Sequence, residues 1–284
     1  IKHDNQSDFY QWFHFKLQTD TCVTGDRQEH IMHIMNAGKS AYVEGWVDYQ
    51  AVASYDREHW FRVPTVFDGD KLTTSLMPEF DSVYFAYFAP YSYERHQDLI
   101  HSAQMDIDCQ LQVLGQTLDG RDMSLLKIGE EGEGKRNIWI TARQHPGETM
   151  AEWFVEGFLD RLLDEDDGVA RALLNKAVIY VVPNMNPDGS VRGHLRTNAV
   201  GANLNREWLE PTMERSPEVF LVREKMLEVG VDMFLDVHGD EVLTVNFVAG
   251  CEGVVKFDAR HNALQDKFKE FMVAITPEFQ DDRG

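Results

Sequence analysis

Three short segments, far apart in the chain, contain the side chains that a catalytic zinc site requires. His145 and Glu148 lie three residues apart in ARQHPGETMAEW, and His238 follows the hydrophobic run of MFLDVHGDE. Two imidazoles and one carboxylate fill three of zinc's four tetrahedral positions and leave the fourth open for water, as catalytic sites do. Zinc lowers the pKa of such a water to about 7. These residues predict one Zn²⁺ per chain, held by His145, Glu148 and His238.

The segment from residue 184 to residue 208, NMNPDGSVRGHLRTNAVGANLNREW, carries cationic and amide side chains. Arg206 presents a planar guanidinium that matches both oxygens of a carboxylate, and Asn205 adds a further donor. Arg196 is suited to stabilise the oxyanion that forms when water attacks a carbonyl group. A metal together with a carboxylate anchor predicts a zinc exopeptidase that acts at the C-terminus of a peptide.

Each motif also has a structural interpretation when it is taken alone. A His and a Glu at this spacing occur readily by chance in a chain with 11 His, and His238 alone is compatible with a hydrogen-bonded histidine at a strand end. For Arg206, the alternative is a structural pair with a carboxylate of the chain. Asp236 points to the same strand face as His238, where it either supports a metal ligand or serves as a solvated or capping residue. The conjunction of the motifs favours the metal site.

The secondary structure expected around the motifs brings them to one edge of a sheet. Strands that alternate with helices indicate an α/β fold with a largely parallel sheet. His145 follows one expected strand, Asn184 ends a second and His238 ends a third. Ligands of open α/β sheets bind just outside the carboxyl ends of the strands. The expected elements are strands at 137–143, 177–184 and 232–238, helices at 150–163 and 217–230, and a hairpin that turns at Asp119-Gly120.

The first 90 residues have a different pattern, with short, aromatic-rich strands separated by turn signals. Such punctuation indicates an all-β sandwich. The polar segment 91–104 is expected to form a linking helix, so we expect a β-sandwich domain at 1–100 and an α/β domain at 101–284. The expected sandwich strands lie at 9–17, 29–37, 60–68, 71–78 and 82–90.

Composition argues against several partners. The chain has 48 Asp and Glu against 27 Lys and Arg, a net charge of −21, which repels nucleic acid and anionic membranes. No apolar run approaches the ~20 residues that span a bilayer. The three cysteines, Cys22, Cys109 and Cys251, are odd in number and far apart in the sequence. They predict buried thiols rather than disulfides, and hence a reducing, cytoplasmic location.

The motifs HPGE, NPDG, GANLNREW and DVHGDE, preceded by YFAYFAPYSYERHQ, resemble those of the metallocarboxypeptidases. The likeness is strongest to the cytosolic-carboxypeptidase branch, in which a β-sandwich precedes the catalytic domain, and it covers almost the whole chain. The resemblance implies a mixed eight-stranded sheet flanked by helices, one zinc ion, and removal of C-terminal residues from peptides or protein tails. It implies zinc ligands at His145, Glu148 and His238, an oxyanion arginine at Arg196, and carboxylate anchors at Asn205 and Arg206.

One departure from the family pattern concerns the general base. In the family this residue is a Glu on a late strand, whereas here His238 is followed by no hydrophobic strand carrying a Glu before the loop-like TPEFQDDRG. We therefore expect the chain to be truncated, with the base beyond Gly284. Two alternatives stay open: a zinc amidase or deacylase acting on N-acyl amino acids or cell-wall peptides, and a non-catalytic peptide-binding zinc domain. Only kinship suggests a preference for C-terminal Glu or Asp, and the sequence does not predict the oligomeric state.

Overall fold

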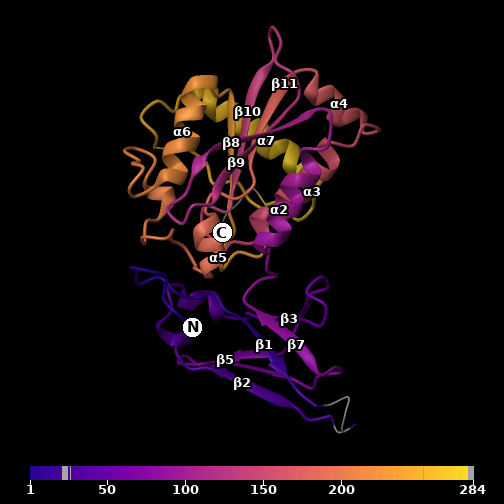
Figure 1. Cartoon of the computed structure of the whole chain (residues 1–284), viewed down its shortest axis with the longest axis vertical. Helices are drawn as coiled ribbons and strands as arrows, with labels where there is room; N and C mark the ends of the chain where they lie inside the picture. Colours follow the sequence, from indigo (N-terminus) through magenta and orange to yellow (C-terminus); the bar gives the residue numbers. More distant parts are fainter. Residues whose placement is uncertain (21–24, 26, 252, 281–284) are drawn as a thin grey trace. The chain divides into compact units, whose positions relative to one another are not determined.

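The structure is a computed structural model that describes residues 1–20, 25, 27–251 and 253–280. The chain forms two compact units, Ile1–Gly239 and Asp240–Gly284, and Figure 1 labels the elements within them. Within the described residues, no helix is both long and apolar enough to cross a membrane.

The N-terminal part of the first unit contains two antiparallel sheets that share one hydrophobic core. Their strand orders are β1-β7-β3-β4 and β2-β6-β5. Phe85 from the first sheet and Leu72 from the second pack in one cluster around Trp46, which confirms the expected sandwich. The strands are β1 (His14–Gln18), β2 (His30–Ile34), β3 (Val52–Ser54), β4 (Phe61–Arg62), β5 (Thr65–Phe67), β6 (Leu72–Leu76) and β7 (Ser82–Ala86), and two 3₁₀ helices, η1 (Ala37–Lys39) and η2 (Val43–Trp46), follow β2.

The prediction of one continuous strand at 60–68 is wrong, because these residues form two strands in different sheets. β4 pairs with β3, whereas β5 pairs with β6. Pro64 lies at the crossing, where its missing N–H prevents a continuous ladder. β3 lies where no strand is expected, because three residues that are all buried give no alternating pattern.

Helix α2 (Tyr93–Ala103) begins at Ser92, whose Oγ accepts a hydrogen bond from the Arg95 amide at 3.1 Å. The five strands that follow form a mixed sheet of order β12-β10-β11-β9-β8. β10 is parallel to β11 and β12, and β9 is antiparallel to β11 and β8. This confirms the mixed sheet, with five described strands where the resemblance implies eight. They are β8 (Cys109–Gln116), β9 (Asp122–Ile128), β10 (Arg136–Ala142), β11 (Ala177–Val182) and β12 (Met233–Val237).

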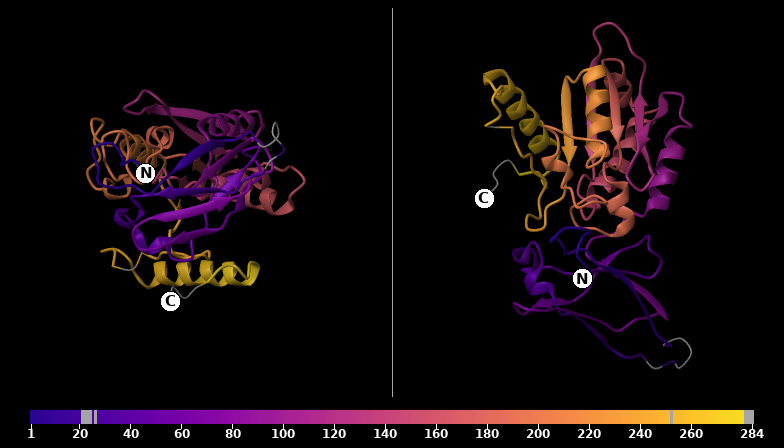
Figure 2. Two further views of the ribbon diagram at one scale, coloured as in Figure 1. Left: turned by 90° about the horizontal axis from the view of Figure 1, so that it is seen from below. Right: turned by 60° about the vertical axis from the view of Figure 1, so that its left-hand side comes forward.

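Both faces of this sheet are apolar and covered by helices. In β11, Ile179 and Val181 pack in the core on the side of α2 and α3, whereas Val178 and Tyr180 pack on the side of α6, as the two-residue period of a strand requires. The strands lie between these two layers (Figures 1 and 2). The remaining helices of the unit are α3 (Met150–Leu162), α4 (Gly168–Leu174), α5 (Pro187–Arg192) and α6 (Pro217–Val229).

The second unit contains α7 (Ala259–Ile275). This helix begins with a capping box formed by Asp258 and His261. Cys251 is exposed in this unit, so the expectation of a buried thiol is wrong there; it belongs to neither of the hydrophobic clusters that bury the sheet. Cys109 in β8 is buried as expected, and Cys22 lies outside the described residues.

Glu218, near the start of α6, is a fully buried carboxyl, 0% exposed. Its oxygens accept hydrogen bonds from Asn198 Nδ2 at 3.3 and 3.2 Å. Burial raises the pKa of Glu218 from 4.5 to about 7, although hydrogen bonds oppose the shift. A carboxyl with a raised pKa in the folded state stabilises the fold below its unfolded pKa, and that contribution is lost as the pH rises through 7.

Glu218→Gln, which keeps the shape without the charge, should therefore raise the free energy of unfolding at pH 8 by about 3 kcal/mol. At pH 4 the two proteins should be nearly equally stable, because Glu218 is then largely neutral in both states. Urea unfolding at pH 4, 6 and 8 measures the difference, with Glu224→Gln on the exposed face of α6 as the control. A difference that does not change with pH contradicts the assignment.

Candidate active site

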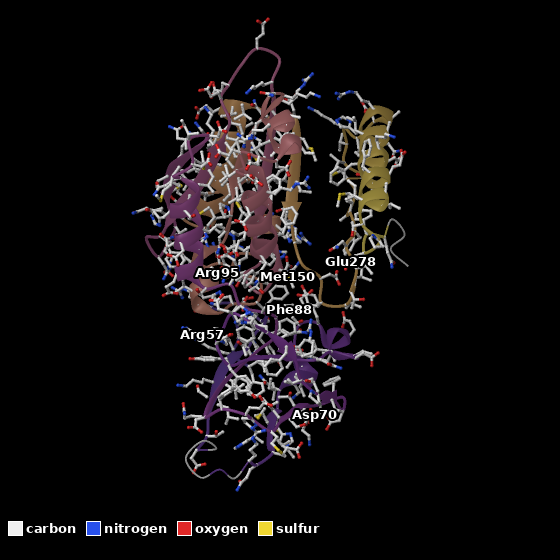
Figure 3. All side chains as sticks on the ribbon, turned by 90° about the vertical axis from the view of Figure 1, so that its right-hand side faces the viewer. Arg57, Asp70, Phe88, Arg95, Met150 and Glu278 are labelled. Carbon is white, nitrogen blue, oxygen red and sulfur yellow. The ribbon has the colours of Figure 1, made fainter. Side chains whose placement is uncertain are left out.

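The parallel register of β10 and β12 brings the candidate metal ligands together. Ala142 lies opposite Val237 at the carboxyl ends of the two strands. His238 is the next residue after Val237, so it lies beside the loop that follows Ala142. That loop carries His145 and Glu148 and leads into α3 at Met150, which is labelled in Figure 3.

The loop turns sharply at Arg143, a buried residue with φ of 55°. Residues other than glycine rarely adopt this region, and here three hydrogen bonds from the guanidinium hold the conformation. Nε donates to the Pro146 carbonyl at 3.1 Å, and Nη1 donates to the Tyr91 carbonyl at 2.8 Å and to Glu152 Oε2 at 2.6 Å. The turn directs the following residues toward the end of β12.

The carboxylate of Glu148 lies between the two imidazoles. Oε1 is 2.7 Å from His145 Nδ1, and Oε2 is 2.9 Å from His238 Nδ1. The Gly239 amide donates to Oε2 at 2.9 Å, and the potential ligand atoms of the three side chains lie within 4.8 Å of one another. The structure therefore brings together the three residues predicted to hold a metal.

The site strongly perturbs the ionisation of its residues. Burial alone would raise the pKa of Glu148, but hydrogen bonds and charge from His145 and His238 outweigh it and lower the pKa to about 2. Burial would lower the pKa of His238, but hydrogen bonds to Asp236 and Glu148 raise it to about 10.

Each imidazole is oriented through its second nitrogen. His145 Nε2 is 3.1 Å from Asn203 Oδ1, and His238 Nε2 is 2.7 Å from Asp236 Oδ2. Asp236 also accepts a hydrogen bond from Thr141 Oγ1 at 2.8 Å, so it supports His238 instead of being solvated. Hydrogen bonds of this kind fix the tautomer and ring orientation of metal-binding histidines, and two imidazole nitrogens with one carboxylate form a donor set that fits zinc.

The segment after β11 packs backbone to backbone against the loop that carries His145. A Cβ added to Gly147 would lie 2.9 Å from the Leu195 carbonyl oxygen, and one added to Gly189 would clash with the Pro146 ring. Real Cβ contacts do not occur at such distances. The glycines of HPGE and NPDG therefore permit the close approach of the two segments.

The NPDG motif starts helix α5. Asn186 is the N-cap, and its Oδ1 accepts a hydrogen bond from the Gly189 amide at 3.0 Å. Its Nδ2 donates to the Gln144 carbonyl at 3.1 Å. The cap of α5 is thus tied to the loop directly before His145.

The predicted cationic residues differ in their surroundings. Arg196 is mostly buried, and its Nη1 is 3.9 Å from Glu148 Oε1. Asn205 and Arg206 lie in η3 (Leu204–Arg206), which follows Asn203 at the site. Arg206 is exposed and donates to the Asn205 carbonyl at 2.9 Å; among the residues that the structure describes, it forms no ion pair with a carboxylate. This disfavours the structural-pair interpretation of Arg206.

Sequence reasoning does not identify Asn203 or Gln144 as part of the site. Gln144 Nε2 donates to Asp236, and its Oε1 accepts from Trp208 Nε1 at 2.9 Å. Both residues lie inside the quoted motifs, directly before His145 or two residues before Asn205. Their place inside these motifs indicates a role at the site, but nothing in the local sequence pattern distinguishes either amide from that of a surface residue.

The site and fold define a metallohydrolase of the α/β class, and comparison with known proteins places it further. Residues 1–88 match the family model of the cytosolic carboxypeptidase N-terminal domain, and residues 97–270 match that of zinc carboxypeptidase. The chain therefore belongs to the zinc carboxypeptidase family, the members of which are hydrolases of peptide bonds.

Relatives and solved structures agree with this family. An uncharacterised protein of Zymomonas mobilis is 51% identical to this chain, and the alignment covers 98% of this chain and 71% of that protein. Cytosolic carboxypeptidase 6 of Mus musculus is 30% identical over 85% of this chain, which spans about half (48%) of that relative. A solved structure of a metallo-carboxypeptidase from Pseudomonas aeruginosa, in complex with (2-guanidinoethylmercapto)succinic acid, is 48% identical to this chain. The two structures superpose with a TM-score of 0.95 over 100% of this chain and 74% of the other chain.

His145→Ala and His238→Ala should each lose the stoichiometric zinc that we expect in the unsubstituted protein, because two protein ligands cannot complete the site. Metal analysis after dialysis against a weak chelator measures this. His33→Ala provides the control, since His33 is an exposed histidine of β2 that bonds Thr73. Zinc content unaffected by both active-site substitutions contradicts the assignment.

Asp236→Asn should weaken zinc binding about 10- to 100-fold without removing a ligand. The amide keeps the shape of the side chain but can present an N–H to His238 Nε2 in place of a carboxylate oxygen. Competition with a chromophoric chelator measures the affinity. An unchanged affinity would mean that the Asp236–His238 hydrogen bond does not orient the ligand.

Proposed function

We propose that this protein is a zinc-dependent metallocarboxypeptidase that hydrolyses the C-terminal peptide bond of peptides or protein tails. The observation that carries the proposal is the convergence of His145, Glu148 and His238 in a chain of this family, with Arg196 beside Glu148. We propose that these three residues hold one zinc ion per chain. When bound, zinc polarises a carbonyl group and activates water at neutral pH.

Arg196 is proposed to stabilise the negative charge that develops on the scissile carbonyl oxygen. Its guanidinium approaches Glu148 from within the protein and is mostly shielded from solvent, where a fixed positive charge acts strongly. A charge held in place beforehand needs no reorganisation during the reaction.

Arg206 and Asn205 are proposed to bind the substrate's terminal carboxylate. Arg206 is exposed and carries a fork of donors that suits two carboxylate oxygens. The ligand named for the Pseudomonas aeruginosa structure is a succinic acid derivative, which carries carboxylates, and this supports carboxylate recognition in the family. No described residue is given the general-base role that the resemblance implies.

The wider setting follows from the same family. We propose a β-sandwich domain at 1–100 and a catalytic domain at 101–284. A cytoplasmic location is supported by the naming of relatives as cytosolic carboxypeptidases. The zinc carboxypeptidase family model supports a peptide or protein substrate. The net charge of −21 disfavours nucleic acid or anionic membrane as partners.

The test compares a peptide that has a free C-terminus with the same peptide as its C-terminal amide. We expect the amide to be a poor substrate, because it lacks the carboxylate that Arg206 binds. Arg206→Ala should raise KM for the free peptide about 10- to 100-fold, the worth of a charged hydrogen-bonded pair, and Arg206→Lys should restore only part of it.

Arg161→Ala, at an exposed arginine of α3, controls for a general loss of positive charge. Equal cleavage of the acid and the amide would support an amidase or deacylase instead. Tight peptide binding without turnover by the zinc-loaded protein would support a non-catalytic binding domain.

A further inference from the structure

The carboxylate of Asp4, which precedes the first strand of the sandwich, is buried against the segment that carries Arg196. Its Oδ1 accepts a hydrogen bond from the Leu195 amide at 2.6 Å, and its Oδ2 accepts from the Arg196 and Thr197 amides at 2.8 and 2.9 Å. Thr197 Oγ1 also donates to Oδ2 at 3.1 Å. Asp4 is 4% exposed. One carboxylate thus satisfies three consecutive backbone amides.

The Arg196 side chain is held by the same N-terminal region. Its guanidinium carbon lies 5.6 Å from the ring centroids of both Phe9 and Tyr42, a cation–π arrangement. On the other side, its Nη1 is 3.9 Å from Glu148. Aromatic rings from the sandwich and a candidate metal ligand therefore confine one guanidinium between them.

Neighbouring contacts fix the rest of this segment from the same direction. The Asn5 amide donates to His194 Nε2 at 3.1 Å, and Asn5 Nδ2 donates to the Ala199 carbonyl at 2.7 Å. Gly201 has φ of +80°, and an added Cβ would lie 3.0 Å from the Asn5 carbonyl oxygen. The backbone from 194 to 201 is therefore shaped around the first residues of the chain.

Removal of the Asp4 carboxylate would leave the Leu195 and Thr197 amides without partners among buried surroundings. An unsatisfied buried amide costs about 1–3 kcal/mol, so the segment would shift to reach water. A displacement of even about 1 Å in a catalytic group can cost 100-fold in rate. The position of Arg196 relative to Glu148 is thus sensitive to Asp4.

We propose that Asp4 is a positioning residue for Arg196, and that the N-terminal sandwich thereby contributes residues that position a catalytic group. Asp4 fixes the backbone of Arg196, while Phe9 and Tyr42 fix its guanidinium. This inference rests on the proposed function of Arg196 at the oxyanion. It gives the sandwich a role in the chemical step, in addition to any role in stability.

The test is a double-mutant cycle on the zinc-loaded protein with a free-C-terminus peptide. Asp4→Ala should lower kcat about 10- to 100-fold, less than the loss of an oxyanion donor, with KM nearly unchanged. Asp4→Asn, which keeps the volume and one acceptor oxygen, should give a smaller loss in the same direction. In an Arg196→Ala background, both substitutions should have little further effect, because they act through Arg196.

A second measurement does not depend on activity. Hydrogen exchange in Asp4→Asn should speed up by at least about tenfold at the Leu195–Thr197 amides, while zinc content stays the same. Asp56→Asn is the matched control, because Asp56 also accepts two backbone amide hydrogen bonds in the sandwich, from Glu58 and His59 at 2.8 Å each. That variant should keep both kcat and the exchange of residues 195–197.

The outcomes separate the two proposals. Full kcat in Arg196→Ala overturns the oxyanion role itself. An impaired Arg196→Ala combined with full kcat in both Asp4 variants overturns only the positioning role. Additive losses in the double variant, or unchanged exchange at Leu195–Thr197, also overturn it, because Asp4 would then act on stability or elsewhere in the site.

Discussion

The burial of the Glu148 carboxylate is the constraint on which the rest of the site depends. A buried charge is stable only when partners surround it, and here the partners come from three separate places in the chain. His145 lies on the same loop, His238 and Gly239 follow β12, and Arg196 arrives from the segment after β11. The carboxylate finds all these partners only when the ends of β10, β11 and β12 lie side by side. The burial of this charge therefore depends on the parallel arrangement of the three strands.

Beneath the site, a second buried charge cluster holds the loop that carries His145. Glu152 of α3 accepts from Arg143 at 2.6 Å and from Asn184 at 3.2 Å, and its Oε1 lies 2.6 Å from His96 Nδ1 of α2. Removing one partner of such a cluster leaves a buried charge uncompensated. This cluster joins α2, α3 and the ends of β10 and β11, and it keeps Arg143 in its left-handed conformation.

The sandwich contacts the catalytic segments at more than one place. Arg95 of α2, labelled in Figure 3, donates to Glu58 beside the sandwich strands at 2.9 Å and to Glu156 of α3 at 2.5 Å. Asp4 reaches the segment around Arg196 by a separate route. The first unit is therefore joined by polar and charged contacts near the site, and substitutions in the sandwich can affect chemistry performed in the α/β part.

The sequence alone predicted the candidate ligand set, the strand ends that carry it, and the succession of a sandwich and an α/β part. These features leave local signals: HPGE follows a buried run, and His238 follows another. The contacts of Asn203 with His145, of Asp236 with His238 and of Asp4 with the Arg196 backbone emerge only in the folded chain. Such contacts join residues up to 193 positions apart and impose no periodicity, so nothing in the local sequence distinguishes these polar residues from solvated ones. The division of 60–68 between two sheets was hidden for the same reason, because strand pairing is set by partners elsewhere in the chain.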